Sequence, residues 1–341
     1  MFRRGTGEVA RDPIAEFWQW WSASGADAAA NGILAGEFGS LTDEIARKVA
    51  AIDPGLQWEF APGTQARHSL CITAAGVPER RPLAERVFRA APPPTPVWEY
   101  HPARAARTSL TEARLDIGSR RLAGSDVRYE FSLDEERQVL DVVVFHPEFA
   151  TMAEDERLRV AFLMLDWQLG EDEVERWVGL VDAVTDEPTA SRRGDSLSNA
   201  VASLAARNHE TAWALLVHES ASRPVTVISA RRPLKWIDSP LRDLHLEVTI
   251  GYTARNDAGL PVRAALADLR AAENELVDLL ADGALLVAHV THDGARTFHF
   301  YVEGDDTGPL ASATAWAQNQ SPPARVTATA DPGWRAVNDY R

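Results

Sequence analysis

The chain has 341 residues, of which 45% are hydrophobic and 25% charged, a composition typical of a globular protein with about two domains. Its 50 acidic residues outnumber its 35 basic residues, and the net charge of −15 disfavours nucleic acid and anionic membrane surfaces as partners. The single cysteine, Cys71, excludes an intrachain disulfide and fits a reducing compartment. No apolar run approaches the roughly 20 residues that cross a bilayer, and no signal-peptide core follows Arg3 and Arg4, so we expect a cytoplasmic protein.

The N-terminal part begins with an aromatic segment. Ile14, Phe17, Trp18 and Trp21 recur at helical spacing, which predicts an amphipathic helix. Its aromatic face either docks onto the core or offers a platform to a partner or ligand. The order helix, strand, strand, helix, strand follows, with elements expected at residues 41–52, 57–61, 68–73, 82–90 and 97–101.

The middle of the chain combines strands with acidic helices. Alternating apolar residues predict strands at 127–133 and 139–145, and a helix at 154–168 ends before Gly170. The segment 185–195 is rich in charge, proline, serine and glycine, which is typical of a linker. We therefore expect an N-terminal domain over residues 1–186 and a C-terminal domain over residues 187–341, the latter beginning with a hairpin of strands 213–218 and 225–228.

The C-terminal part carries the clearest local patterns. Five apolar residues recur at spacings of four and three and predict a helix that ends near Gly283. They are Ala265, Leu269, Ala272, Leu276 and Leu279. Asp293 and Gly294 separate two β-prone runs, which predicts a hairpin with a two-residue turn in which His292 faces Ala295.

These elements predict a fold class. A strand at 246–252 precedes the helix and the hairpin, and a helix at 309–318 and a strand at 325–329 follow them. Strand, helix, strand, strand, helix, strand is the order of a ferredoxin-like βαββαβ sandwich. Because the N-terminal part repeats much of this order, we expect an α+β protein built as tandem ferredoxin-like units, with antiparallel sheets and helices on one face.

Three histidines within eleven residues raise the question of a metal site. If Asp293 and Gly294 form the turn, His289 and His299 lie on opposite faces of the hairpin, and His292 lies beside the turn. Metal ligands must converge on one point. The interpretation from sequence is that these histidines are structural or solvated, so no metal ligand, cofactor-binding residue or catalytic residue is assigned.

Motifs of known enzyme classes are missing from the sequence. It contains no G-x-G-x-x-G, no Walker A motif and no H-E-x-x-H. The four residues 194–197 spell the nucleophile block of the GDSL esterases, but they follow the expected linker, and the Asp-x-x-His that completes that motif is absent. The sequence thus favours a protein without its own catalysis and leaves enzyme activity open.

Acidic residues concentrate in one stretch. Residues 154–187 contain eleven acids against three arginines. Within it, Glu171, Asp172, Glu173 and Glu175 open a helix, where carboxylates interact favourably with the positive end of the helix dipole. The same four residues are the candidates for contact with a partner protein that has a basic surface, because a patch of one sign raises the encounter rate with the opposite sign.

The region 213–340 resembles a known family. The similarity is carried by Gly259-Leu260-Pro261, the Leu269, Glu273 and Leu276 helix, the Phe298-His299-Phe300-Tyr301 strand, and Asp331-Pro332-Gly333-Trp334 with Tyr340. These features resemble the bacterial family catalogued as domain of unknown function 695, and more distantly the RraB-like regulators of ribonuclease E. The resemblance implies a ferredoxin-like fold and, for RraB alone, an acidic protein that inhibits its enzyme by protein contact.

Two functions follow as expectations. The first is a non-catalytic, acidic binding or regulatory protein that acts through protein–protein contact. The alternative is an enzyme or small-molecule-binding protein whose site lies between the two domains. Converging polar groups with perturbed pKa values in a deep pocket would favour the alternative.

Overall fold

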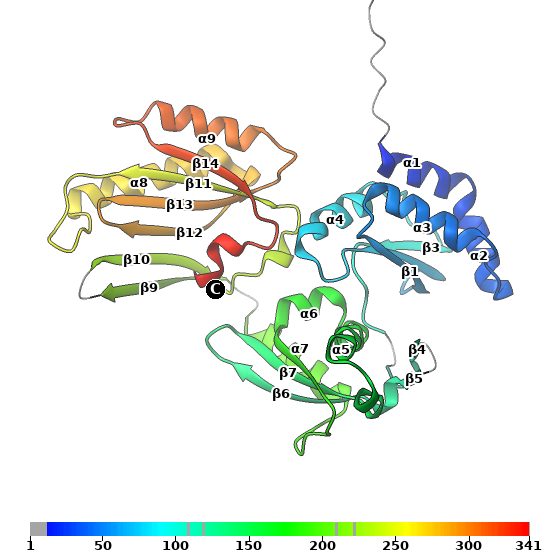
Figure 1. Ribbon diagram of the computed structural model, residues 1–341. Coiled ribbons are helices and arrows are strands. Elements are labelled where there is room, and N and C mark those ends of the chain that lie inside the picture. Colours follow the sequence, from blue (N-terminus) through cyan, green and yellow to red (C-terminus); the bar gives the residue numbers. More distant parts are fainter. Residues whose placement is uncertain (1–11, 108–109, 118–119, 209–210, 221–222, 341) are drawn as a thin grey trace, which may run out of the picture. The chain divides into compact units, whose positions relative to one another are not determined.

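The computed structural model describes all residues except 1–11, 108–109, 118–119, 209–210, 221–222 and 341. The chain forms two compact units, residues 1–105 and residues 106–341. Both contain helices and sheets, so the chain is an α+β protein (Figure 1). Among the described residues, no helix is both long and apolar enough to cross a membrane.

The N-terminal unit packs helices on a small sheet. Its elements are α1 (Pro13–Trp20), a π-helical turn (Trp21–Gly25), α2 (Ala26–Ala35), α3 (Leu41–Ile52), β1 (Gln57–Pro62), β2 (His68–Thr73), α4 (Arg81–Arg89) and β3 (Trp98–His101). β2 pairs antiparallel with β1 and parallel with β3. Phe17, Trp18 and Trp21 are buried in the core of this unit, so the aromatic face of the first helix docks onto the core.

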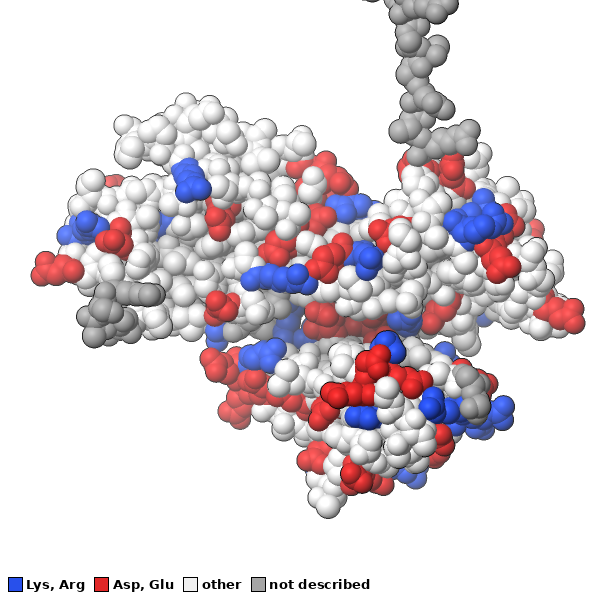
Figure 2. Space-filling view, viewed as in Figure 1, with Lys and Arg blue, Asp and Glu red and all other residues white. Residues whose placement is uncertain are grey.

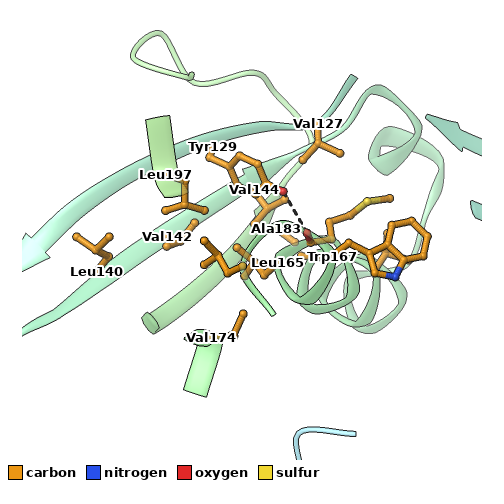
Figure 3. Close-up of a cluster of buried hydrophobic side chains, with 14 of the residues drawn as sticks. Val127, Tyr129, Leu140, Val142, Val144, Leu165, Trp167, Val174, Ala183 and Leu197 are labelled. Atoms are coloured by element: carbon orange, nitrogen blue, oxygen red, sulfur yellow. Dashed lines mark hydrogen bonds between the residues drawn. The ribbon is translucent and has the colours of Figure 1, made fainter. Parts of the chain in front are cut away.

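The second unit starts with a module of strands and helices. It comprises β4 (Arg114–Ile117), β5 (Arg120–Ala123), β6 (Arg128–Asp134), β7 (Val139–Phe145), α5 (Glu154–Leu169), α6 (Glu171–Trp177), β8 (Val178–Val184) and α7 (Gly194–Arg207). β7 lies between β6, its antiparallel neighbour, and β8, its parallel neighbour. Figure 3 shows the core of this middle module, in which the Tyr129 hydroxyl donates to the Met164 carbonyl of α5 at 3.3 Å.

A six-stranded sheet forms the rest of the second unit. Its elements are β9 (Ala212–Ser220), β10 (Arg223–Arg232), β11 (Leu244–Gly251), α8 (Arg263–Leu280), β12 (Ala284–His292), β13 (Ala295–Val302), α9 (Gly308–Gln318) and β14 (Arg325–Ala330). The strand order is β14-β11-β13-β12-β10-β9, and every neighbouring pair is antiparallel. One face packs against α8 and α9, and the other carries a separate core with Trp236, Trp334 and Val337.

The hairpin prediction is confirmed, with one change in register. His292 faces Ala295, and the turn residues Asp293 and Gly294 have φ values of 40° and 84°, the left-handed conformation that a two-residue turn of this kind requires. A bulge between Leu286 and Ala288 then shifts the pairing by one residue. The last residue of the apolar stripe of α8 also differs from the prediction. Leu280 is buried, whereas the predicted Leu279 is 46% exposed.

The boundary between the two units lies after residue 105. The boundary predicted from the sequence, after residue 186, falls inside the second unit. Ala183 precedes the 185–195 segment and Leu197 follows it, yet both belong to the same core. Within the segment, Arg192 exchanges two backbone hydrogen bonds of 2.8 Å with Tyr129 of β6. The segment is therefore a surface connection inside one module, although its composition is that of a linker.

A fragment pair tests this division. We expect residues 1–105 to fold alone, whereas in a fragment of residues 1–186 the middle module should lose its stability. That cut removes Leu197, Val201 and Leu204, whose burial contributes roughly 1.5 to 3 kcal/mol each. Amide hydrogen exchange measures both effects. Protection of β6 and β7 in the 1–186 fragment at the level of the full chain would contradict the division.

Candidate functional site

The four predicted contact residues occupy the first turns of α6, and their side chains differ in exposure. Glu171 is buried at 6% exposure, Asp172 and Glu173 are half-buried, and Glu175 is exposed. Glu175 accepts a hydrogen bond from the Trp236 indole nitrogen at 2.7 Å. Glu171 therefore has little surface to offer a partner, and Glu175 already binds a neighbouring side chain of its own unit.

Ion pairs engage another of these acids. Glu173 pairs with Arg176 on the same helix, and Arg176 also binds Asp238 with an N–O distance of 2.7 Å. Glu175 directly, and Glu173 through Arg176, thus connect α6 to the residues around Trp236. Whether a partner binds them stays a prediction.

The outer part of the acidic stretch is more accessible. Glu154 and Asp155 at the start of α5, and Asp182, Asp186 and Glu187 at and after β8, are exposed. Figure 2 shows acidic side chains gathered over the middle module, with some basic ones among them. Leu158 and Phe162 on α5 are also exposed, at 37% and 42%. Exposed aromatic side chains such as Phe162 are enriched in protein contact surfaces, and charged residues suit the polar rim of such a surface.

A second group of polar residues lies in the six-stranded sheet. Glu247 on β11 is paired with His299 on β13 and with Thr327 on β14, so the three form one row across three strands. His245 lies two residues before Glu247 and therefore points to the same face of the sheet. Strand pairing alone brings two imidazoles and one carboxylate together. We call His245, Glu247 and His299 the His/Glu cluster.

The side-chain atoms of this cluster lie close together. His245 Nε2 is 3.0 Å from His299 Nδ1, and Glu247 Oε1 is 3.8 Å from the same His299 nitrogen. The other oxygen of Glu247 accepts a hydrogen bond from the Thr327 hydroxyl at 3.0 Å. His245 and His299 are 3% and 6% exposed, whereas the Glu247 side chain is 40% exposed. The cluster is thus buried on its histidine side and open to solvent on its glutamate side.

Burial sets the charge of the two imidazoles. It lowers the pKa of His299 to about 4, and the neighbouring His245 acts in the same direction, while Glu247 opposes both effects. Burial also lowers the pKa of His245, against the opposing influence of Glu247 and Asp331. Both histidines are therefore neutral at pH 7, so each ring has one nitrogen that carries a proton and one that carries a lone pair.

The end of the chain packs beside this cluster. The Tyr301 ring stacks between His245, with centroids 5.0 Å apart, and Trp334, with centroids 4.4 Å apart. Its hydroxyl donates to Asp331 Oδ2 at 2.6 Å, and Asp331 also accepts from the backbone N–H groups of Arg335 and Ala336. Tyr340 then packs edge-on against His299, with centroids 5.7 Å apart. The aspartate thus fixes the last segment over the face of the sheet that carries the cluster.

Comparison with known families covers this region. Residues 225–340 match the Family of unknown function (DUF695). The match runs from β10 to the last turn, so it contains the whole His/Glu cluster and the segment that packs beside it. Of the residues on which the resemblance was based, five lie at this place in the fold: His299, Tyr301, Asp331, Trp334 and Tyr340. No curated protein and no solved structure gives a significant match to the chain.

The histidines considered from the sequence as metal ligands were His289, His292 and His299, and His245 was not among them. His289 and His299 do lie on opposite faces, since His289 approaches Glu273 of α8 at 3.1 Å and His299 packs against Tyr340. In the structure His245, and not His289 or His292, lies beside His299. The predicted strand began at residue 246, whereas β11 begins at Leu244. The available signal was the His-x-Glu pattern, which places two ligand-type side chains on one face of a strand.

Proposed function

We propose that the protein acts by binding another protein through the acidic surface of its middle module. The observation that supports this most is the outer face of α5. Glu154, Leu158 and Phe162 are spaced by four residues and so lie along one side of that helix. Aromatic side chains such as Phe162 are enriched in protein interfaces, and a charged rim raises the association rate. The partner we infer has a basic surface with an apolar pocket.

The role of such a protein would be regulatory rather than catalytic. The distant resemblance to the RraB-like group, of which RraB itself acts through protein contact, supports this class. The C-terminal strand order β14-β11-β13-β12, with α8 and α9 as its two helices, is the order of a ferredoxin-like sandwich and supports that interpretation of the DUF695 region. The tandem arrangement is not supported, because the described part of the N-terminal unit has a three-stranded sheet with one parallel pair.

A double variant on α5 tests the proposal. Affinity capture from the native lysate identifies the partner, and Leu158→Ala combined with Phe162→Ala should then make the complex dissociate at least about 10-fold faster. Both side chains are exposed, so the free energy of unfolding should change by less than about 1 kcal/mol. The matched control is Val277→Ala with Leu279→Ala, two apolar residues of α8 that are 42% and 46% exposed. Equal dissociation rates in the two double variants would refute the proposed surface.

The contribution of the acidic residues to the association rate is tested with a separate variant. Asp172→Asn with Glu173→Gln removes two charges of α6 and keeps the buried Glu171 and the hydrogen bond of Glu175. We expect slower association and a weaker dependence on salt, because screening acts over about 10 Å at 0.1 M salt. Asp278→Asn, at an exposed position of α8, is the control. An unchanged association rate and salt dependence would leave these acids as a solvated surface.

A further inference from the structure

We propose that His245, Glu247 and His299 form a binding site for one divalent transition-metal ion of the Zn²⁺ type. This site is independent of the acidic surface of the middle module. The first support is the backbone. Because β11 lies between β13 and β14, the pairing of Glu247 with His299 and the two-residue step to His245 fix the three Cα positions. The convergence of the donors therefore does not depend on one loop conformation.

The second support is the distances. One donor atom from each of the three residues lies within 4.8 Å of the other two. A tetrahedral ion at about 2.0 to 2.2 Å from each ligand requires donor atoms roughly 3.3 Å apart. The nitrogens of His245 and His299, at 3.0 Å, are close to this separation. Glu247 Oε1 lies 3.8 Å from His299 Nδ1 and within 4.8 Å of the His245 donor, so this half-exposed carboxylate has to move towards both nitrogens.

The surroundings resemble the outer shell of a metal centre. The Thr327 hydroxyl holds the second oxygen of Glu247, and such hydrogen bonds orient ligating carboxylates. Tyr301 and Tyr340 pack against the two imidazoles and restrict their rings. The Glu247 side chain is 40% exposed, so an ion would enter from this side and take a water molecule as its fourth ligand there. Three protein ligands with one open position is the pattern of sites where a metal ion meets a substrate or an inhibitor.

The donor set also selects the ion. Two imidazole nitrogens and one carboxylate oxygen suit Zn²⁺, Fe²⁺ or Co²⁺, whereas Ca²⁺ and Mg²⁺ prefer sites made entirely of oxygen. The competing explanation is a plain hydrogen bond between the two histidines, in which one ring donates and the other accepts. That explanation predicts no saturable binding of Zn²⁺ at this place.

Titration of the full-length protein with Zn²⁺ decides between the two explanations. After treatment with a chelator and its removal, isothermal calorimetry should show one Zn²⁺ bound per chain, with no competition from Mg²⁺ or Ca²⁺ in large excess. Co²⁺ should give the visible absorption bands of a tetrahedral site with nitrogen and oxygen ligands. Absence of saturable Zn²⁺ binding in the intact protein overturns the proposal.

Three variants locate the ion. His299→Ala should weaken Zn²⁺ binding by at least about 100-fold, and Glu247→Gln, which keeps the shape of a half-exposed side chain, by at least about 10-fold. His292→Ala, an exposed histidine of the same hairpin, should bind like the wild type. Because a buried histidine can be needed for folding, Glu247→Gln is the deciding variant. Unchanged Zn²⁺ affinity in Glu247→Gln, or equal losses in His292→Ala, would place the ion elsewhere and overturn the proposal.

Discussion

Replacing Trp21 by alanine is expected to cause the largest loss of stability in the N-terminal unit. The Trp21 side chain is fully buried, its ring packs edge-on against Trp98 with centroids 5.0 Å apart, and its indole N–H donates to the Tyr100 hydroxyl at 3.1 Å. Truncating such a residue costs about 3 to 5 kcal/mol. Since a whole domain is stable by only about 5 to 15 kcal/mol, the unit should open far more often.

Amide hydrogen exchange in the full chain measures this effect directly. Protection of β2 and α3 should fall on the order of 100-fold or more, because each 1.4 kcal/mol corresponds to a factor of ten. Trp213→Ala is the matched control, since the Trp213 side chain is 49% exposed on β9. Trp213→Ala should leave the amide protection of the N-terminal unit unchanged. Equal protection in wild type and Trp21→Ala would mean that the packing of Trp21 against Trp98 and Tyr100 does not hold this unit together.

The spacing of aromatic and apolar residues predicted several helices, although α2 was not predicted. Phe17, Trp18 and Trp21 recur with the period of a helix, and the structure buries all three. Spacing along the chain cannot predict which strands pair, because pairing depends on contacts between distant residues. The parallel pairing of β2 with β3 was accordingly not predicted. The strand β8 was not predicted either.

The domain boundary shows a different limit. Charge, proline and glycine indicate that a segment lies on the surface, and residues 185–195 are mostly exposed as this predicts. Composition does not indicate whether the elements before and after a surface segment share a core. Here they do, because α7 places Leu197 in the core that also contains Val142 of β7 (Figure 3).

The His/Glu cluster could not be predicted from the sequence for a geometric reason. His245 and His299 are 54 residues apart, and their contact depends on the register between β11 and β13. An error of two residues in the start of β11 was enough to leave His245 out of the strand. By contrast, the hairpin turn was predicted correctly, because it depends on Asp293 and Gly294 alone.

Replacing Glu99 by glutamine is expected to be the second most damaging single change in the N-terminal unit. The Glu99 carboxylate, on β3, accepts hydrogen bonds from the backbone N–H groups of three residues between β1 and β2. They are Thr64 at 2.7 Å and Gln65 and Ala66 at 2.8 Å. An amide would turn one acceptor into a donor that faces these N–H groups. We expect a loss of roughly 2 to 4 kcal/mol at pH 6.

The pH dependence of stability should change as well. Burial alone would raise the pKa of Glu99, but the hydrogen bonds from the backbone and from His101 outweigh it and lower the pKa to about 2. A group whose pKa is lower in the folded state stabilises the fold above its ordinary pKa of 4.5. This contribution is lost as the pH falls from about 4.5 towards 2. The wild type should therefore lose more stability between pH 6 and pH 3 than Glu99→Gln does.

Free energies of opening for the β2 amides, obtained from hydrogen exchange at both pH values, provide the comparison. Glu37→Gln, an exposed position of the same unit, is the control for losing one carboxylate, and it should behave like the wild type. Two results would contradict the argument. One is equal stability of Glu99→Gln and wild type at pH 6, and the other is an equal loss in both proteins on going to pH 3. Either result would mean that the Glu99 carboxylate does not hold the loop between β1 and β2 against β3.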